Sequence, residues 1–196
     1  MTHSKSILKV TMAIVLAISF TSCGNGQKQG NENVSRAEQT ENPSPATNTV
    51  SEASVTASLL DAYLGIKNAL VKDDQAAAAE YGTALAESTG AFDVETFAAS
   101  EQQELEEILE VAKEHGEHIA KSDIGHQREH FEALGKDIND LVAIAGTDRD
   151  LYQQYCPMYN NNAGGMWLSA SDEVLNPLFG SKMLNCGSVQ ETIESR

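Results

Sequence analysis

Apolar residues recur with helical spacing in four segments between residues 57 and 145. In the first segment, Leu59, Tyr63, Ile66 and Leu70 are separated by four, three and four residues, which places them on one face of a helix. Three further segments carry apolar residues at comparable spacing. Their stripes are Ala77, Ala78, Tyr81 and Leu85; Leu105, Ile108, Ala112, His115 and Ile119; and Ile124, Phe131, Leu134, Ile138, Leu141 and Ala145. The pattern predicts four amphipathic helices.

The connections between these segments are short and contain residues that begin or end helices. Asp73 or Asp74 can cap the second helix, which ends at Gly90, and the fourth helix begins near Asp123 and ends at Gly146. Short connections make successive helices antiparallel neighbours. We therefore expect an all-α fold, an up-down-up-down four-helix bundle.

The chain changes character after this helical region. Residues 147–190 are rich in Asn, Gly and Pro, yet they also contain Trp167, Leu168 and Phe179. These side chains are too apolar for a solvated tail. We expect an irregular segment that packs on the bundle, within one domain covering residues 51–196.

The N-terminus has the pattern of an export signal. Lys5 and Lys9 precede an apolar run over residues 12–20, which is shorter than the roughly 20 residues that a membrane-spanning helix needs. The run leads into Phe20-Thr21-Ser22-Cys23, which resembles a lipobox, where a cysteine receives diacylglycerol. We expect residues 1–22 to be a lipoprotein signal peptide and Cys23 to be lipidated; ordinary secretory cleavage that leaves Cys23 free is the alternative.

Residues 23–50 are predicted to be a flexible tether, because they contain few large aliphatic residues and no aromatic ones. The acylated Cys23 would anchor the chain to a lipid bilayer. The predicted location is periplasm-facing, on a bacterial membrane. Gly24 is not the aspartate associated with inner-membrane retention, so the outer membrane is favoured.

The chain is strongly acidic, with a formal net charge of -16. Loss of residues 1–22 removes two lysines and no acid, which makes the charge about -18. Such a surface repels phosphate backbones, so we expect no nucleic-acid partner.

Four sulfur-containing side chains form two pairs in the C-terminal segment. Cys156 and Met158 are two residues apart, and Met183 and Cys186 are three apart. Thiolate and thioether sulfurs are soft donors that select Cu(I), and by analogy Ag(I), over Mg²⁺ or Ca²⁺. If the two turns face each other, the four sulfurs form a metal site that Trp167 could cover.

Cys156 and Cys186 also have a structural alternative. In an oxidising compartment two cysteines commonly form a disulfide, which here would close a loop of about 30 residues and stabilise the fold by roughly 3 to 4 kcal/mol. Met158 and Met183 would then fill gaps in the core. Metal binding and disulfide formation can also alternate with the redox state of the thiols, and the cysteines can do neither.

Histidines give a second and weaker signal for metal binding. His126 and His130 are four residues apart on the fourth predicted helix and could chelate one ion from the same face. His115 lies on the apolar stripe of the third helix, with His118 beside it, and is expected to be a core residue. The sulfurs are the favoured ligands, and the pair on the fourth helix comes second.

Several enzyme classes do not fit the sequence. Ferritin-like bundles use Glu-x-x-His motifs, whereas Ala112, His115, Asp123 and Gln127 stand three residues before the four helical histidines. The chain also lacks the Cys-x-x-Cys-His of c-type haem attachment and the Cys-x-x-Cys of thioredoxin-type sites. We expect no catalytic activity.

The C-terminal segment contains a set of spaced residues, namely Tyr155-Cys156-Pro157-Met158, Trp167-Leu168-Ser169, Asn176-Pro177, Phe179-Gly180, Lys182-Met183-Leu184 and Cys186-Gly187. This set resembles a family of extracytoplasmic domains of unknown function. Its members occur as lipoproteins of Bacteroidetes-type bacteria and as domains on adaptor subunits of Cus-type copper and silver efflux pumps. Leu178 departs from the aromatic residue usual in that family, and His126 and His130 are not general to it. The likeness covers roughly residues 53–191.

The resemblance implies a helical periplasmic domain associated with heavy-metal handling, in which Cys156, Met158, Met183 and Cys186 match recurrent sulfur positions. We therefore expect a membrane-anchored lipoprotein that binds Cu(I), Ag(I) or another soft heavy metal for homeostasis or efflux. An efflux-pump adaptor or another envelope metal-handling protein is the expected partner. The alternative is a disulfide-stapled structural or interaction module of the cell envelope that binds no metal.

Overall fold

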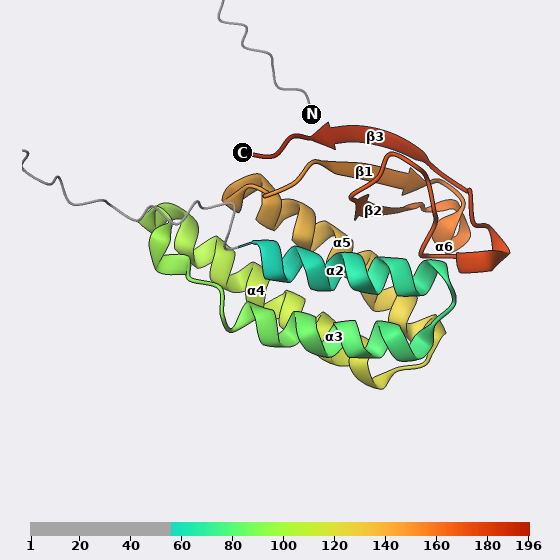
Figure 1. Cartoon of the computed structure of the whole chain (residues 1–196), viewed down its shortest axis with the longest axis horizontal. Helices are drawn as coiled ribbons and strands as arrows, with labels where there is room; N and C mark the ends of the chain where they lie inside the picture. The colour runs from blue at the N-terminus through green and yellow to red at the C-terminus, as the bar shows by residue number, and fades with distance from the viewer. Residues whose placement is uncertain (1–55) are drawn as a thin grey trace, which may run out of the picture. The chain divides into compact units, whose positions relative to one another are not determined.

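The computed structural model of the chain describes residues 56–196, which include four long helices (Figure 1). These helices coincide with the four amphipathic segments predicted from the sequence. Successive helices pack against one another, and the first also contacts the last. The up-down-up-down order of a bundle stays a prediction. The helices are α2 (Ala57–Val71), α3 (Gln75–Thr89), α4 (Ala99–Lys121) and α5 (Ile124–Ala145), with a 3-10 turn, η1 (Val94–Thr96), before α4.

Side-chain caps set the helix boundaries where the sequence predicts them. The Asp74 carboxylate accepts a hydrogen bond of 3.0 Å from the backbone N–H of Ala77 at the start of α3. The Asp123 carboxylate accepts two such bonds at the start of α5. Gly146 follows α5 with a φ of 76°, a conformation that glycine adopts without a steric penalty.

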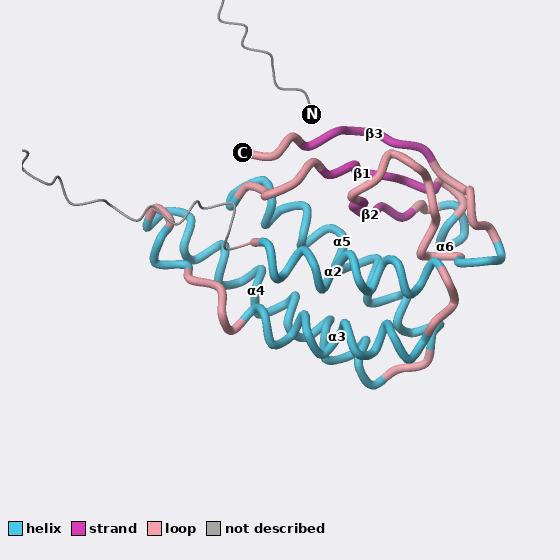
Figure 2. Tube along the Cα trace, in the orientation of Figure 1, coloured by secondary structure: helices cyan, strands magenta, loops and turns pink. Residues whose placement is uncertain are grey.

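The C-terminal segment is not irregular, and the all-α prediction is wrong here. It forms a three-stranded antiparallel sheet in the order β2-β1-β3 (Figure 2). The Asn, Gly and Pro residues that suggested irregularity lie mostly in the turns between strands, where such residues are favoured. The elements are β1 (Leu151–Cys156), α6 (Tyr159–Asn162), β2 (Gly165–Ser169), η2 (Gly180–Lys182) and β3 (Ser188–Ile193).

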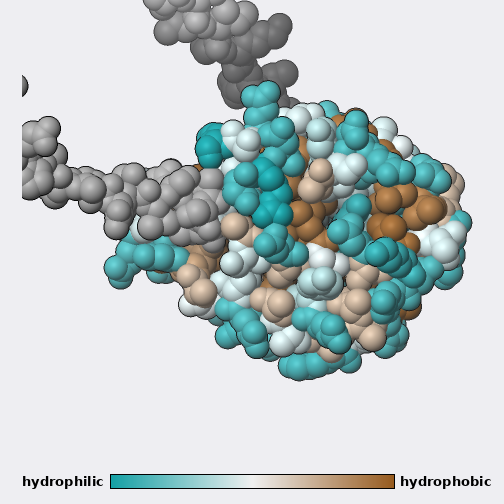
Figure 3. Space-filling model, viewed as in Figure 1, coloured by the Kyte–Doolittle hydropathy of each residue, from teal (hydrophilic) through white to brown (hydrophobic). Residues whose placement is uncertain are grey.

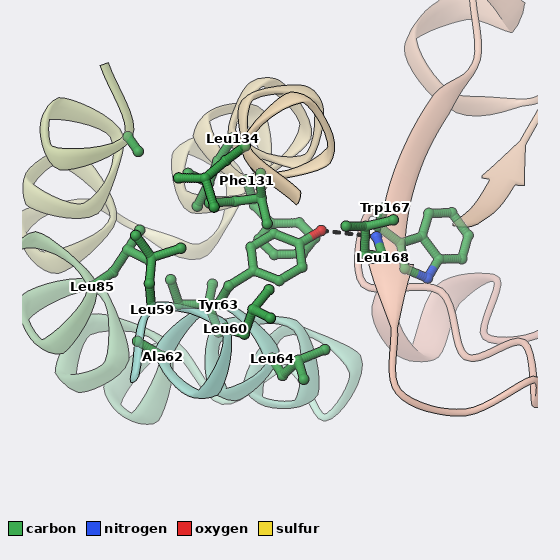
Figure 4. Packing of buried hydrophobic residues seen from close by; sticks show 14 of the residues in the cluster. Leu59, Leu60, Ala62, Tyr63, Leu64, Leu85, Phe131, Leu134, Trp167 and Leu168 are labelled. Atoms are coloured by element: carbon green, nitrogen blue, oxygen red, sulfur yellow. Dashed lines mark hydrogen bonds between the residues drawn. The ribbon is translucent and has the colours of Figure 1, made fainter. Parts of the chain in front are cut away.

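The sheet packs on the helices through β2, as expected of an apolar C-terminal segment. Tyr63 of α2 stacks on Phe131 of α5 with 5.1 Å between ring centroids, and its hydroxyl oxygen accepts a 2.9 Å hydrogen bond from the backbone N–H of Leu168 (Figure 4). Trp167 is fully buried, and its indole N–H donates to Gln154 at 2.8 Å. The helices and the sheet therefore share one core.

A buried arginine joins α5 to two other parts of the domain. Arg128 donates hydrogen bonds to the backbone carbonyls of Leu70 and Pro177, each at 3.0 Å, and to the carboxylate of Asp73 at 2.5 Å. The second Asp73 oxygen accepts from the backbone N–H of Ser181. This network connects the end of α2, the first turns of α5 and the loop before β3.

The predicted signal peptide, Cys23 and the whole predicted tether lie outside the described residues. Within residues 56–196, none of the helices combines the length and the apolar character that crossing a membrane requires.

Candidate metal centre

The hairpin of α4 and α5 gathers four histidines at one end of the domain. Two residues separate the helices, since α4 ends at Lys121 and α5 begins at Ile124. His115 and His118 lie in the last two turns of α4, and His126 and His130 lie in the first two turns of α5. The connection therefore brings two helical histidine pairs face to face.

Three of these imidazoles form a compact set of donors. One nitrogen from each of His118, His126 and His130 lies within 4.8 Å of the other two. The Nε2 atoms of His126 and His130 are 3.0 Å apart, close to the roughly 3.3 Å between two nitrogens on one tetrahedral ion with bonds of 2.0–2.1 Å. The His118 ring is exposed and stacks on His130 with 4.4 Å between centroids, so it would rotate to complete the site.

A carboxylate holds the second nitrogen of His126. Its Nδ1 lies 2.9 Å from a carboxylate oxygen of Glu129, and a carboxylate can only accept, so Nδ1 carries the proton. In the neutral ring the lone pair is then on Nε2, the atom that faces His130. This carboxylate–histidine arrangement is the one that commonly orients metal-ligating histidines.

The second nitrogen of His130 is also engaged, by His115. The two Nδ1 atoms are 2.9 Å apart, and His115 Nε2 lies 3.5 Å from the Asp137 carboxylate. His115 is half-buried rather than a core residue. It lies behind the triad and links His130 to an acidic group.

Burial and mutual repulsion keep His130 neutral. Desolvation, followed by the charges that His118, His115 and His126 could carry, lowers the pKa of His130 to about 4. Desolvation also lowers the pKa of His115 and raises that of Asp137. Since neutral imidazole is the form that ligates metal, His130 needs no proton removed at pH 7.

The sequence pattern found half of this cluster. The spacing of His126 and His130 predicted a chelating pair, and the structure brings these two rings together. His118 was missed as a donor, and His115 was predicted to be a core residue. The sequence did contain a signal for the full cluster. The two histidine pairs stand at similar numbers of residues before and after the predicted helix connection, and a tight helical hairpin brings such pairs together.

The four predicted sulfur positions lie at the end of the sheet. Cys156, at the end of β1, and Cys186, just before β3, form a disulfide, and the Cys186 carbonyl accepts a hydrogen bond from the buried Asn176 side chain. The side chain of Met158 is 51% exposed, and Met183 is half-buried. In this oxidised form the two cysteines offer no thiolate to a metal.

Residues 59–150 match the model of a family described as "Protein of unknown function (DUF3347)". The match supports a domain-of-unknown-function family. It spans α2 to α5 and includes the four histidines, whereas the disulfide lies beyond its end. No curated protein and no solved structure matches the chain.

Proposed function

We propose that this chain is a metal-binding protein of the bacterial cell envelope and that His118, His126 and His130 bind one copper ion. The observation that carries the proposal is the placement of three imidazole nitrogens within 4.8 Å of one another. Partners already hold the remaining nitrogens of His126 and His130. A shared cation would accept the lone pairs of these converging imidazole nitrogens.

The donor set favours copper among the metals available. Imidazole suits copper, zinc, iron and nickel and does not suit Mg²⁺ or Ca²⁺. For a given nitrogen site, divalent affinity rises along the first row to Cu²⁺ and falls at Zn²⁺. The acidic chain, with a formal charge of -16, also raises the local concentration of cations. The resemblance to domains of copper and silver efflux adaptors points to the same metal.

Metal titration of the purified full-length chain tests this function. We expect one equivalent of Cu²⁺ to bind with nitrogen-ligand hyperfine structure in its electron paramagnetic resonance spectrum. His130→Ala, which removes the central donor, should weaken binding at least 100-fold. His126→Ala and His118→Ala should each weaken it at least tenfold.

An exposed carboxylate on α4 provides the matched control. Glu110→Gln changes the charge of the same helix away from the cluster and should leave copper affinity within twofold. Equal losses of copper affinity in Glu110→Gln and His130→Ala would show that the acidic surface attracts cations in general and that the histidines form no specific site. Stronger binding of Zn²⁺ than of Cu²⁺ would overturn the choice of metal.

The sulfur pairs support a second candidate site that needs reduced thiols. The disulfide shows that the turns carrying Cys156 and Cys186 do approach each other, which a shared Cu(I) or Ag(I) site requires. After reduction, the two thiolates would be soft donors, and we propose that Met158 and Met183 complete the set. The Cu(I) affinity of the reduced chain should fall in the double variant Cys156→Ser with Met183→Leu. Unchanged affinity would mean that the disulfide has only a structural role.

Our proposal places the domain outside the cytoplasm, anchored through Cys23. The grounds are the sequence pattern of residues 1–23. Metabolic labelling with a clickable palmitate analogue should mark the wild-type chain and not Cys23→Ser. A metal-efflux adaptor is the partner that we propose, since a tethered domain can deliver bound copper to a neighbouring envelope protein.

A further inference from the structure

A second concave site lies between α2 and the loop that follows β2, away from the histidine cluster. Its cavity has a volume of about 560 Å³, within the range of small-molecule pockets. Figure 3 shows hydrophobic surface between α2 and the sheet with hydrophilic residues around it. The lining includes Leu64, Lys67, Tyr81, Ser169 and Ser171.

Lys67 is the unusual member of this lining. The residue is only 4% exposed, and a buried ammonium normally requires close partners. Within residues 56–196 its one hydrogen bond is a long contact of 3.4 Å to the Asn68 amide oxygen. No carboxylate of the described residues forms an ion pair with it at 4.0 Å or less. An ammonium has three protons to donate, so Lys67 has unused donor capacity inside a cavity.

The opposite wall is a fixed turn that offers further donors. Gln154 is buried and donates to the backbone carbonyls of Ser171 and Glu173, at 2.9 and 3.1 Å. The hydroxyl oxygens of Ser169 and Ser171 each accept a backbone N–H from within the turn. Each hydroxyl therefore keeps its own proton available for a ligand.

The other lining residues include an aromatic ring, an ion-paired arginine and a carboxylate. Tyr81 lies over Gly65, where an added Cβ would collide with the ring, and its ring is 43% exposed. Arg149 at the rim directs its guanidinium to Asp61 and Asp148, which leaves Lys67 as the cation available to a ligand. Glu173 also lines the cavity, so a dianion would meet more repulsion than a monoanion.

We propose that this cavity binds a small organic carboxylate, with its carboxylate on Lys67 and the serine hydroxyls and its apolar body against Leu64 and Tyr81. The site is independent of the copper function, because it shares none of its residues.

Benzoate titrated into the full-length chain, followed by NMR shifts of the backbone amides of Ser171 and Glu173, tests the site. We expect saturable shifts that are weakened at least tenfold in Lys67→Met. The exposed Lys72, which follows the last residue of the same helix, gives a matched control, and Lys72→Met should bind as the wild type does. Glu173→Gln should bind benzoate about two- to fivefold more tightly, because it removes the competing carboxylate.

Several outcomes would overturn the proposal. They are the absence of saturable shifts in the wild type, equal binding by wild type and Lys67→Met, or tighter binding of inorganic phosphate than of benzoate. If Lys67→Met does not fold, the Glu173→Gln variant decides, since unchanged affinity there contradicts a carboxylate bound beside Glu173.

Discussion

The two side chains that support the histidine triad, Glu129 and His115, differ in how strongly they are shielded from water. Glu129, which holds His126, has a side chain that is 69% exposed, whereas His115, which holds His130, is 19% exposed and backed by the half-buried Asp137. Hydrogen bonds that fix a ligand contribute more where water cannot replace them. The two supports should therefore contribute unequally to metal binding.

His115→Asn should weaken copper binding by about 10- to 100-fold, the usual effect of losing an outer-shell partner. Glu129→Gln should weaken it by less than about tenfold, since water can replace the exposed carboxylate. Competition titration against a chelator measures both losses. Larger loss in Glu129→Gln than in His115→Asn would contradict the assigned roles.

The link between Asp73 and its neighbours predicts a pH-dependent stability. Hydrogen bonds from Ser181 and Arg128 lower the pKa of the Asp73 carboxyl. A depressed folded-state pKa stabilises the fold above the unfolded value of about 3.9 and loses this effect as the pH falls through the folded pKa. Asp73→Asn should lower the Tm at pH 7, and this difference should shrink below about pH 4.

Thermal unfolding between pH 3 and pH 7 measures this difference, with the exposed Asp172→Asn as the control that leaves Tm unchanged. A gap between wild type and Asp73→Asn that stays constant across the range would show that the carboxylate charge contributes nothing.

Among the elements, α3 and α4 pack backbone against backbone at two glycines, Gly82 and Gly116. A Cβ built on Gly116 would lie 2.8 Å from the carbonyl oxygen of Gly82 and 3.1 Å from the backbone nitrogen of Ala86. Backbone atoms cannot rotate away as a side chain can, so the helices would have to separate.

Gly116→Ala should destabilise the domain by about 1 to 3 kcal/mol, although alanine in an isolated helix is about 1 kcal/mol better than glycine. Urea unfolding measures the change. Gly90→Ala is the control, because a Cβ there meets its nearest atom at 3.6 Å. A more stable Gly116→Ala protein would mean that helix propensity outweighs packing.

The helices were predictable from the sequence and the strands were not, for a physical reason. Each helix repeats its apolar stripe over 15 to 23 residues, which gives periodicity room to emerge. The strands have five or six residues, and β3, Ser188–Ile193, is almost wholly exposed. This strand pairs with β1 through backbone contacts, so its side chains show little of the hydrophobic pattern by which a strand is recognised in a sequence.

At the scale of the whole molecule, the candidate site was only partly predictable, because most of its residues meet only when the helices pack against one another. His126 and His130 share a helix face, so their proximity follows from spacing. The approach of His118 and His115 depends on the rotation of α4 against α5, which the stripes fix only roughly. The same holds for Lys67, which lines one cavity together with the turn of residues 169–173. Gln154 holds this turn through two hydrogen bonds.

The disulfide joins the end of β1 to the loop before β3, and in its oxidised form it should act on stability alone. Cys156 and Cys186 are 30 residues apart. Without the cross-link the unfolded chain gains entropy, which lowers the free energy of unfolding by about 3 to 4 kcal/mol. Cys156→Ala with Cys186→Ala should lower the free energy of unfolding by that amount in urea titrations. Reduction of the wild type should cause a similar loss.

Copper binding by the same variant tests whether the sheet segment contributes to the metal centre. The histidine donors lie on α4 and α5, whereas the disulfide joins the end of β1 to the loop before β3. The double alanine variant should therefore retain one Cu²⁺ with unchanged affinity while its unfolding midpoint falls. Loss of the Cu²⁺ ion in a variant that remains folded would instead show that the sheet segment contributes to the metal centre, and the sulfurs would then return as its ligands.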